Sequence, residues 1–440
     1  MTIGKAENIT IQGGKMTIYE DLKWREIIFQ SSDPEGIPEL LANPGQTLYC
    51  GFDPTAASLH IGSLLPLLTL KRFQLAGHKP IALVGGATGL IGDPSGKATE
   101  RTLNTKETVD SYVEGIRAQI EKVLDPSGST GVRVVNNYDW MAPITAIEFL
   151  RDVGKHFSVN MMMAKDSVSA RLDRDEVGIS YTEFSYMLLQ AYDFYHLYKE
   201  YDCKMQVGGA DQWGNMTAGI ELVRRKLSKQ AYCLTFPLVT NAAGQKFGKS
   251  EAGAIWLDAE LTSPYALYQY FVNTDDRDVV KYLKYFTLLS HEDISDLISK
   301  VETAPERREA QKKLAYEVTS IIHDKTEADK VVAASQALFG DSDLASVDLK
   351  TLLSAVESAP TLSYDTVESV PNALQLAVDS GLIASKSEAR RQIGSGGVYI
   401  NNQRVSDIDF QPKTSDFIHG ALLLIRRGKK NYAVVKLGGK

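Results

Sequence analysis

Short apolar segments alternate with amphipathic segments through the first half of this sequence, and this alternation limits the fold more than any other feature. The apolar segments have the length of strands and lie at Leu48–Phe52, Pro80–Val84, Val132–Asn136, Met205–Val207 and Leu234–Val239. Between them, apolar residues recur at helical spacing, as in Leu64–Ala76 and Lys106–Leu124. Strands that alternate with helices predict an α/β fold with a parallel sheet, which binds ligands at the carboxyl ends of its strands.

The pattern changes after Ser263-Pro264, where strand signals give way to helix starts. Predicted capping boxes stand at Ser290-His291-Glu292-Asp293, Thr326-Glu327-Ala328-Asp329 and Ser385-Lys386-Ser387-Glu388. A chain of 440 residues suggests about three domains with connecting segments. The division we expect is an extension at 1–15, a parallel-sheet domain at 16–239, a loop linker at 240–262, an α-helical domain at 263–339, a connector at 340–372 and a small C-terminal domain at 373–440.

Positive charge is concentrated near the C-terminus. Residues 373–440 hold 11 Lys and Arg against 5 Asp and Glu, whereas the whole chain has a net charge of −7. A basic segment on an acidic body indicates a polyanionic partner, because cationic side chains neutralise phosphates. A solvated basic face without a partner explains the charge equally well.

Several classes of protein are excluded by composition. No apolar run approaches the ~18 residues that a membrane span needs, and residues 1–14 lack the apolar core of a signal peptide. Cys50, Cys203 and Cys233 form no C-x-x-C pair, so we expect neither a disulfide framework nor a structural zinc site. The sequence therefore predicts a cytoplasmic protein without a membrane partner.

Two segments far apart in the chain carry residues suited to phosphate. His60-Ile61-Gly62-Ser63 precedes a predicted helix, whose N-terminus attracts anions, although a structural histidine would also fit there. Lys246-Phe247-Gly248-Lys249-Ser250 follows the last predicted strand. It is not a P-loop, because that motif needs Gly where this chain has Ala243. A kinase of the P-loop type is therefore disfavoured.

Two further segments gather polar residues near predicted strands. Tyr186, Gln190 and Asp193 are spaced i, i+4, i+7 and share one helix face, where they form either a core network or a site for a small polar ligand. Gln206–Asn215 runs from a strand end into a helix, and its two glycines suit close approach of a ligand.

In their order along the chain, these motifs resemble the signatures of class I aminoacyl-tRNA synthetases. Tyr49–His60, Val84–Gly96 and Tyr186–Asp193 are similar to the bacterial tyrosyl-tRNA synthetases, and Lys386–Val405 resembles the S-four-type RNA-binding module at their C-terminus. The resemblance covers Met16–Lys440. It implies a Rossmann-like catalytic domain with a parallel sheet, an α-helical domain on the anticodon side and a small α+β RNA-binding domain of S-four type.

The resemblance also implies an activity and its partners. The family makes tyrosyl-adenylate and pyrophosphate from L-tyrosine and ATP, and then passes the tyrosyl group to the 3′ end of tRNA(Tyr), as a homodimer. Magnesium would accompany ATP as co-substrate, and neither a prosthetic group nor a protein metal site is expected.

Individual roles follow from position in the family motifs. The residues implied in catalysis at the phosphates are Thr55, His60, Lys97, Arg101, Lys246, Lys249 and Ser250. Those implied in binding tyrosine are Tyr49, Asp93, Tyr186, Gln190, Asp193 and Gln212. Those implied in binding ATP are Cys50, Gly51, Asp53, His60, Gly62, Ser63, Gly209, Asp211 and Lys249.

One position departs from the family pattern. Ser63 stands where most members carry a second histidine, so we expect Ser63 to contribute less to adenylate formation than His60. The segments Met161–Met163 and Tyr181–Tyr201 are either dimer interface or core.

RNA contacts are expected from basic side chains, although basic residues at helix ends commonly just complement the helix dipole. The candidates are Arg224, Arg225, Arg390, Arg391, Arg426, Arg427, Lys429 and Lys430. Two other functions remain compatible with the motifs. One is an RNA-binding or splicing protein that keeps the architecture without catalysis, and the other is the tryptophan-specific sibling enzyme.

Overall fold

The computed structural model describes residues 16–95, 103–165, 168–169, 179–250, 253–339, 343–357, 359–428 and 431–438. Contacts divide the chain into two compact units. Unit 1 consists of Met1–Thr262 and Thr274–Glu317, and unit 2 consists of Ser263–Asn273 and Val318–Lys440. The segment 263–339, which we expected to form one helical domain, therefore supplies helices to both units.

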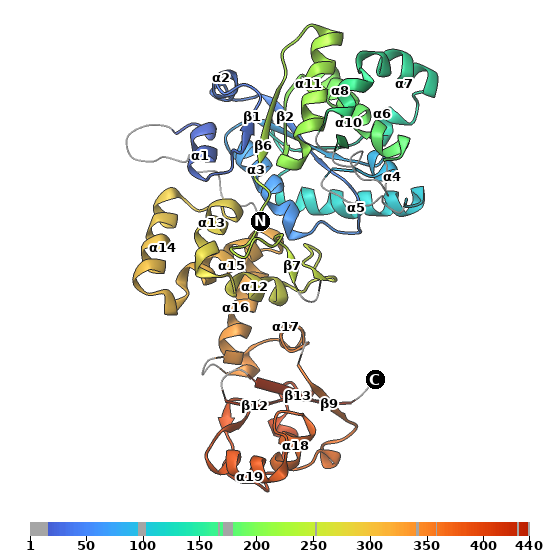
Figure 1. The fold of residues 1–440 in the computed structure, drawn as a ribbon. Coiled ribbons are helices and arrows are strands. Elements are labelled where there is room, and N and C mark those ends of the chain that lie inside the picture. Colours follow the sequence, from blue (N-terminus) through green and yellow to red (C-terminus); the bar gives the residue numbers. More distant parts are fainter. Residues whose placement is uncertain are drawn as a thin grey trace. The chain divides into compact units, whose positions relative to one another are not determined.

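A six-stranded sheet forms the centre of unit 1 (Figure 1). In spatial order its strands are β1 (Gln30–Ser31), β6 (Tyr232–Phe236), β5 (Cys203–Gly209), β2 (Thr47–Phe52), β3 (Lys79–Val84) and β4 (Arg133–Asn136). All neighbours pair in parallel except β1, which runs antiparallel to β6. The predicted α/β fold with a parallel sheet is confirmed. The edge strand β1 was not predicted, because two residues are too few to show a strand pattern.

The order of the strands fixes where a ligand can bind. The chain passes from β2 outward to β3 and β4, and later returns to place β5 and β6 on the other side of β2. Strand order therefore reverses between β2 and β5. In open parallel sheets, a crevice forms at such a switch point, outside the carboxyl ends of the strands.

Helices cover both faces of this sheet (Figure 1). The helices of the segment up to β6 are α1 (Ile18–Trp24), α2 (Gly36–Leu41), α3 (Leu64–Leu75), α4 (Thr88–Ile91), α5 (Lys106–Val123), α6 (Tyr138–Met141), α7 (Ala146–Asp152), α8 (Val159–Met163), α10 (Tyr181–Tyr201) and α11 (Trp213–Leu227). Helix α5 shows how the sequence pattern works. Val109, Val113, Ile116, Ile120 and Val123 recur every three or four residues and are all buried.

Helix α10 and helix α11 pack together over β5 and β6. Their apolar residues join those of the strands in one core, in which Tyr49 of β2 lies beside Phe194 of α10 and Met216 of α11. This packing fixes one face of α10 against the sheet, next to the switch point.

Among the residues that the structure describes, the rest of unit 1 contains a short hairpin and three helices. These elements are β7 (Lys249–Ser250) paired with β8 (Gly253–Ala254), α13 (Asp276–Phe286), α14 (His291–Thr303) and the beginning of α15 (Glu309–Ile322). The predicted capping box at Ser290 is confirmed, since Ser290 and Asp293 cap each other's backbone at the start of α14.

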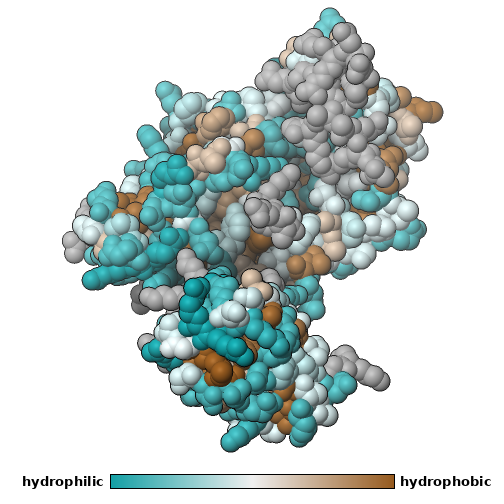
Figure 2. Space-filling view, turned by 60° about the horizontal axis from the view of Figure 1, so that its bottom comes forward, coloured by the Kyte–Doolittle hydropathy of each residue, from teal (hydrophilic) through white to brown (hydrophobic). Residues whose placement is uncertain are grey.

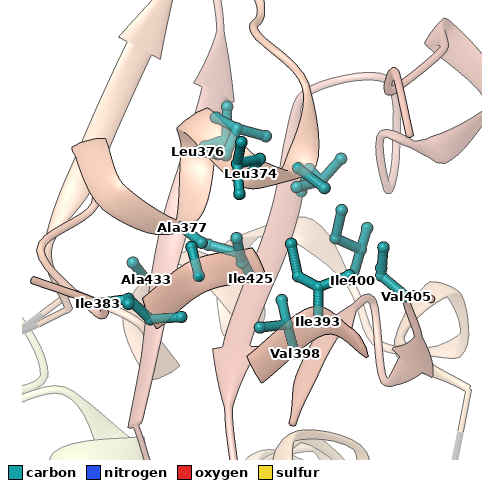
Figure 3. Close-up of a cluster of buried hydrophobic side chains, with 14 of the residues drawn as sticks. Leu374, Leu376, Ala377, Ile383, Ile393, Val398, Ile400, Val405, Ile425 and Ala433 are labelled. Atoms are coloured by element: carbon teal, nitrogen blue, oxygen red, sulfur yellow. The ribbon is translucent and has the colours of Figure 1, made fainter. Parts of the chain in front are cut away.

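Unit 2 contains helices and a five-stranded sheet. The helices are α12 (Pro264–Val272), α16 (Lys325–Phe339), α17 (Leu349–Ala355), α18 (Ala373–Asp379) and α19 (Lys386–Gly394). The strands in spatial order are β11 (Gln403–Arg404), β10 (Val398–Ile400), β12 (Leu422–Arg427), β13 (Asn431–Leu437) and β9 (Thr361–Tyr364). Apolar residues of α18, α19 and the sheet, among them Ile393 and Ile425, form its core (Figure 3).

Two sequence predictions in unit 2 need correction or extension. The predicted capping box at Thr326 is wrong, because α16 already begins at Lys325, and the carboxylate of Asp324 accepts a hydrogen bond from the backbone of Glu327. The predicted capping box at Ser385 is confirmed in one half: the Ser385 side chain caps α19 by accepting from the backbone of Glu388, whereas the Glu388 carboxylate pairs with Arg427. The expected connector 340–372 also contributes β9, which pairs in parallel with β13.

The exposed surface is mixed in character. On the face shown in Figure 2, hydrophobic residues form small separate groups among hydrophilic ones. Among the helices in the described ranges, none has the length and apolar character that crossing a bilayer requires.

Candidate active site

A pocket of about 580 Å³ opens at the carboxyl ends of β2 and β5, where the strand order reverses. Most of the site residues expected from the sequence line it, namely Tyr49, Cys50, Gly51, Asp53, Thr55, His60, Gly62, Ser63, Asp93, Tyr186, Gln190, Asp193, Gly209, Asp211, Gln212 and Lys246. The topology of the sheet thus brings together side chains that are far apart in the sequence.

Asp193 of α10 lies at the buried end of this pocket, with 2% of its surface exposed. Its Oδ2 accepts a hydrogen bond from Asn137 Nδ2 at 3.1 Å, and its Oδ1 accepts one from Trp140 Nε1 at 2.8 Å. Burial raises the pKa of Asp193 to about 7, although both hydrogen bonds favour the ionised form and act in the opposite direction. The carboxyl group is therefore fixed in orientation and titrates near neutral pH.

Tyr49 of β2 lines the same end of the pocket and is 1% exposed. Its ring is tilted against that of Phe194, with the centroids 5.4 Å apart. Its hydroxyl has no hydrogen-bond partner among the residues that the structure describes. Burial and then the charge of Asp193 raise the pKa of Tyr49 well above its ordinary value. Because a buried polar group without a partner is unfavourable, this hydroxyl is available to a ligand.

Tyr186 belongs to a second part of the same network. Its hydroxyl donates to Asp53 Oδ2 at 2.8 Å, while Thr88 Oγ1 donates to Asp53 Oδ1 at 2.9 Å. Asn137 Nδ2 lies 3.1 Å from Thr88 Oγ1 and so links this group to Asp193. Tyr186 and Asp193, which share one face of α10, are therefore held by a continuous polar network. A core network was one of the two interpretations that their spacing allowed.

Asp93 and Gln212 form the polar wall on another side of the pocket. Gln212 Nε2 donates to Asp93 Oδ2 at 2.7 Å, and the backbone of Ser95 donates to Asp93 Oδ1 at 2.9 Å. Burial raises the pKa of the neighbouring Asp211, and Asp93 adds to this increase. The two carboxylates and the amide can accept and orient a small cationic or polar ligand.

His60 stands immediately before the first helical turn that leads into α3. A Cβ atom on Gly62 would lie 2.6 Å from Cε1 of His60, so only glycine leaves room for this position of the imidazole. From the sequence we expected Gly62 to admit a nucleotide, whereas here the imidazole fills that space. Burial and then the positive charge of Lys246 lower the pKa of His60.

The segment after β6 lies directly against His60. The backbone of Ile61 donates to the carbonyl of Ile255 at 2.9 Å, and His60 forms an antiparallel β-bridge with Trp256. Lys246 lines the same pocket as His60. The two motifs that the sequence indicated as phosphate sites therefore meet at one cavity.

Four of the predicted catalytic residues have side chains outside the described part of the chain. Lys97 and Arg101 lie outside the described residues. The backbone of Lys249 and Ser250 forms β7, but their side chains lie outside the described part of the chain.

Comparison with known proteins identifies the architecture around this pocket. The family model for class I tRNA synthetases, described as "W and Y", matches residues 43–340. The chain belongs to this family. A second model, for the SYY-like C-terminal domain of tyrosine–tRNA ligase, matches residues 352–435. The expected small C-terminal α+β domain is thereby also supported.

Individual members of the family resemble the chain over nearly its whole length. It is 52% identical to the tyrosine–tRNA ligase of Bacillus velezensis over 95% of this chain and 99% of that protein. It is 50% identical to the tyrosine–tRNA ligase of Geobacillus kaustophilus over 96% of this chain and all of that protein. A C-terminally truncated mitochondrial tyrosyl-tRNA synthetase from Aspergillus nidulans has 32% identity and a TM-score of 0.68, covering 76% of this chain and 97% of that one.

The sequence did not indicate Thr88, Asn137 or Trp140, and it indicated Gln206 only as the first residue of the segment Gln206–Asn215. Gln206 is 3% exposed, and its Oε1 has no hydrogen-bond partner within the described ranges. Asn137 directly follows β4 at the carboxyl edge of the sheet, and Gln206 lies within β5. The place of Asn137 directly after a predicted strand was a signal that could have found it.

The residues expected to contact RNA differ in how far they are already engaged. Arg224 and Arg225 both pair with Glu221, and Arg427 pairs with Glu388 at 2.8 Å. The guanidinium of Arg426 lies over the ring of Tyr399, 4.5 Å from its centroid.

Arg390 and Arg391 of α19 are both exposed. Lys429 and Lys430 lie outside the described residues.

Proposed function

We propose that this chain is a tyrosine–tRNA ligase. It activates L-tyrosine with ATP to give tyrosyl-adenylate and pyrophosphate, and it then transfers the tyrosyl group to the 3′ end of tRNA(Tyr). One observation carries the proposal: the pocket that holds Asp193 and the unpartnered hydroxyl of Tyr49 at one end is lined by His60 and Lys246 elsewhere. The substrates of the relatives named above agree with it.

The buried end of the pocket suits a phenol. The phenol O–H of tyrosine would donate to Asp193, and its oxygen would accept from Tyr49. Phenylalanine would leave both groups without a partner in a closed site, which costs free energy for each unpaired group. The larger indole of tryptophan has a donor but no hydroxyl acceptor for Tyr49. Selectivity for tyrosine follows from these two groups.

The remainder of the amino acid would be held by the polar walls of the pocket. Tyr186, Gln190 and Asp93 would bind the ammonium group, and Gln212 would bind the carboxylate. Cys50, Gly51, Asp53, Gly209 and Asp211 would surround the adenosine. With these assignments, the carboxylate of the bound tyrosine would lie between the phenol ring of the same tyrosine and the phosphates of ATP.

The first step needs alignment rather than a base. The attacking tyrosine carboxylate is already ionised at neutral pH, and it forms a bond to the α-phosphorus while the bond to the pyrophosphate oxygen breaks. The protein must hold the two reactants in line and stabilise the negative charge that develops on the pyrophosphate. Thr55, His60, Lys97, Arg101, Lys246, Lys249 and Ser250 would supply that stabilisation. Magnesium enters with ATP as part of that substrate.

The experiment that tests the function is ATP–pyrophosphate exchange measured with each of the twenty standard amino acids. We expect exchange with tyrosine alone at a rate far above background. Exchange with tryptophan instead would assign the sibling specificity, and no exchange with any amino acid would support a non-catalytic RNA-binding protein.

Transfer to tRNA should depend on the C-terminal domain. Deleting residues 373–440 should weaken tRNA charging while leaving pyrophosphate exchange nearly intact, because the pocket lies wholly in unit 1. Strand β9 would lose its neighbour β13 in that variant, so a second cut before Thr361 removes the complete sheet and controls for misfolding. Equal loss of both activities in both variants would contradict a modular enzyme.

A homodimer is part of the proposal. Large apolar side chains are exposed around α7, α8 and the start of α10, namely Ile147, Leu150, Val159, Met163 and Tyr181. Exposed apolar side chains that gather in one region are typical of protein interfaces, and a second copy of the chain is the partner we propose. Sedimentation of the Tyr181→Glu variant should shift toward the monomer.

We propose a cytoplasmic location for the enzyme.

A further inference from the structure

Helix α13 holds the segment that carries Lys246 through a series of contacts along one of its faces. At its first turn, the carboxylate of Asp278 accepts a hydrogen bond from the backbone of Ala242 at 2.8 Å. One turn later, Lys281 Nζ donates to the carbonyl of Thr240 at 2.7 Å. Asp278 is only 4% exposed, so its hydrogen bond is shielded from water.

Aromatic packing completes this attachment at the other end of α13. The ring of Phe247 stacks on that of Phe286, with the centroids 4.7 Å apart and the planes 16° from parallel. Tyr282 meets the same ring edge-on at 4.9 Å. Phe286 is completely buried, and Phe247 is 5% exposed. Since Phe247 follows Lys246 directly, the position of its ring limits where the lysine side chain begins.

The C-terminal end of α13 is in turn fixed to α3 by one buried arginine. Arg72 Nη2 donates to the carbonyls of Lys284, Tyr285 and Thr287, at 3.1, 2.9 and 2.7 Å. A cation at this place complements the negative end of the helix dipole. Arg72 is 4% exposed and belongs to α3, the helix that follows His60 in the chain, and α13 packs against α3 (Figure 1).

We propose that α13 positions the phosphate end of the pocket, and that Phe286 and Asp278 are positioning residues that act through Lys246. Arg72 ties α13 to α3, the helix that follows His60, so the His60 and Lys246 sides of the site are placed by one continuous structure. Neither Phe286 nor Asp278 lines the pocket. The proposal rests on the proposed function, because it concerns the same phosphate-binding groups.

The test is a double-mutant cycle in the full-length protein. Phe286→Leu should lower kcat for tyrosine-dependent pyrophosphate exchange by about 10- to 100-fold, since a misplacement of ~1 Å in a site of this kind has effects of that size. The affinity for tyrosine without ATP should stay unchanged. In a Lys246→Ala background, Phe286→Leu should have almost no further effect on kcat, because the group it positions is gone.

Two control variants separate positioning from general damage. Phe271→Leu makes the same change at a completely buried ring of α12 in unit 2, and it should lower the unfolding temperature without the selective loss of kcat. Asp278→Ala should reproduce the kinetic loss, and Asp278→Asn, which keeps an acceptor for the Ala242 amide, should restore most of it.

Three outcomes would overturn the proposal: kcat of Phe286→Leu equal to that of the parent, a kinetic loss as large in the Lys246→Ala background as in the parent, or an equal loss in Phe271→Leu. Failure of the proposed function is distinguished from these outcomes, because the unmodified chain would then show no tyrosine-dependent exchange at all.

Discussion

The two ends of the pocket differ in how far the protein has organised them before a ligand binds. At the amino-acid end, Asp193 is nearly inaccessible and its carboxylate accepts two hydrogen bonds from fixed donors. At the phosphate end, Thr55 and Lys246 are exposed, and His60 is only partly buried. The first end is a polar network fixed in a core, and the second is an exposed polar surface whose Lys246 segment is held by contacts with α13.

This difference matches what each end must recognise. A phenol differs from a phenyl ring by one oxygen, so its partners must be fixed and kept away from water before binding. A triphosphate is large and highly charged, so exposed cationic side chains can attract it without being kept away from water. The comparison predicts that changes at the phosphate end affect rates, whereas changes at the buried end affect affinity for the amino acid.

The largest effect is expected at the phosphate end. His60→Ala should lower the rate of tyrosyl-adenylate formation by about 100- to 1,000-fold, as does loss of a group that stabilises developing negative charge. Tyrosine affinity in the absence of ATP should be unchanged. Single-turnover kinetics and equilibrium dialysis measure the two quantities separately, and a large loss of tyrosine affinity would show that the two ends are not independent.

The next largest effect is a pH dependence confined to the buried end. Burial raises the pKa of Asp193 to about 7, so the carboxyl group becomes protonated as the pH falls below 7. The protonated group offers the phenol a neutral acceptor in place of a carboxylate, and tyrosine affinity should therefore fall by up to about tenfold per pH unit below that value. Titration calorimetry from pH 5 to 8 tests this. Asp193→Asn should bind weakly at every pH, and a parent profile that is flat over this range would refute the assignment.

A smaller effect, with opposite signs for stability and binding, is expected at Tyr49. Tyr49→Phe removes a buried hydroxyl without a partner, which should stabilise the free protein by about 1 kcal/mol. The same change removes a donor to the phenol and should weaken tyrosine binding by about 2- to 12-fold, the loss of one neutral hydrogen bond. Thermal unfolding and tyrosine titration are the measurements. Unchanged binding would mean that the hydroxyl does not face the ligand.

The smallest effect is expected at Ser63. Its side chain makes no capping hydrogen bond at the start of α3, and it is neutral where the family usually has a histidine. Ser63→Ala should therefore slow adenylate formation by only about two- to threefold, the loss of at most one weak hydrogen bond. The same single-turnover assay used for His60→Ala gives the comparison. A larger loss at Ser63 than at His60 would reverse the assignment of the two positions.

Local patterns predicted the main elements of the fold because each carries its own signal. The buried stripe of α5 and the parallel strands β2 to β6 are visible as apolar periodicity and short apolar runs. The edge strand β1 and strand β9 show no such pattern in the sequence, because both are short and depend on partners far along the chain, Thr235 and Val434 among them. The wrong prediction at Thr326 has a different cause, because Asp324, two residues earlier, is an equally good capping residue.

The pocket could be predicted in outline but not in its supporting contacts. Residues at strand ends and in motifs, such as Tyr49 and Lys246, were identified from the sequence and do line the pocket. Trp140 could not be identified in this way, because nothing in its local sequence shows that its indole reaches Asp193, which lies on a helix far along the chain. The role of Gly62 was also hidden, since it depends on the orientation of the His60 ring.

The central claim is that one pocket holds tyrosine and the α-phosphate of ATP close enough to react. The most direct measurement incubates the protein, without tRNA, with radiolabelled tyrosine and ATP labelled at the α-phosphate, and then isolates the complex by gel filtration. We predict that both labels elute with the protein in equal amounts, after release of one pyrophosphate for each adenylate formed. Retention of either label without the other, with no release of pyrophosphate, would contradict the account.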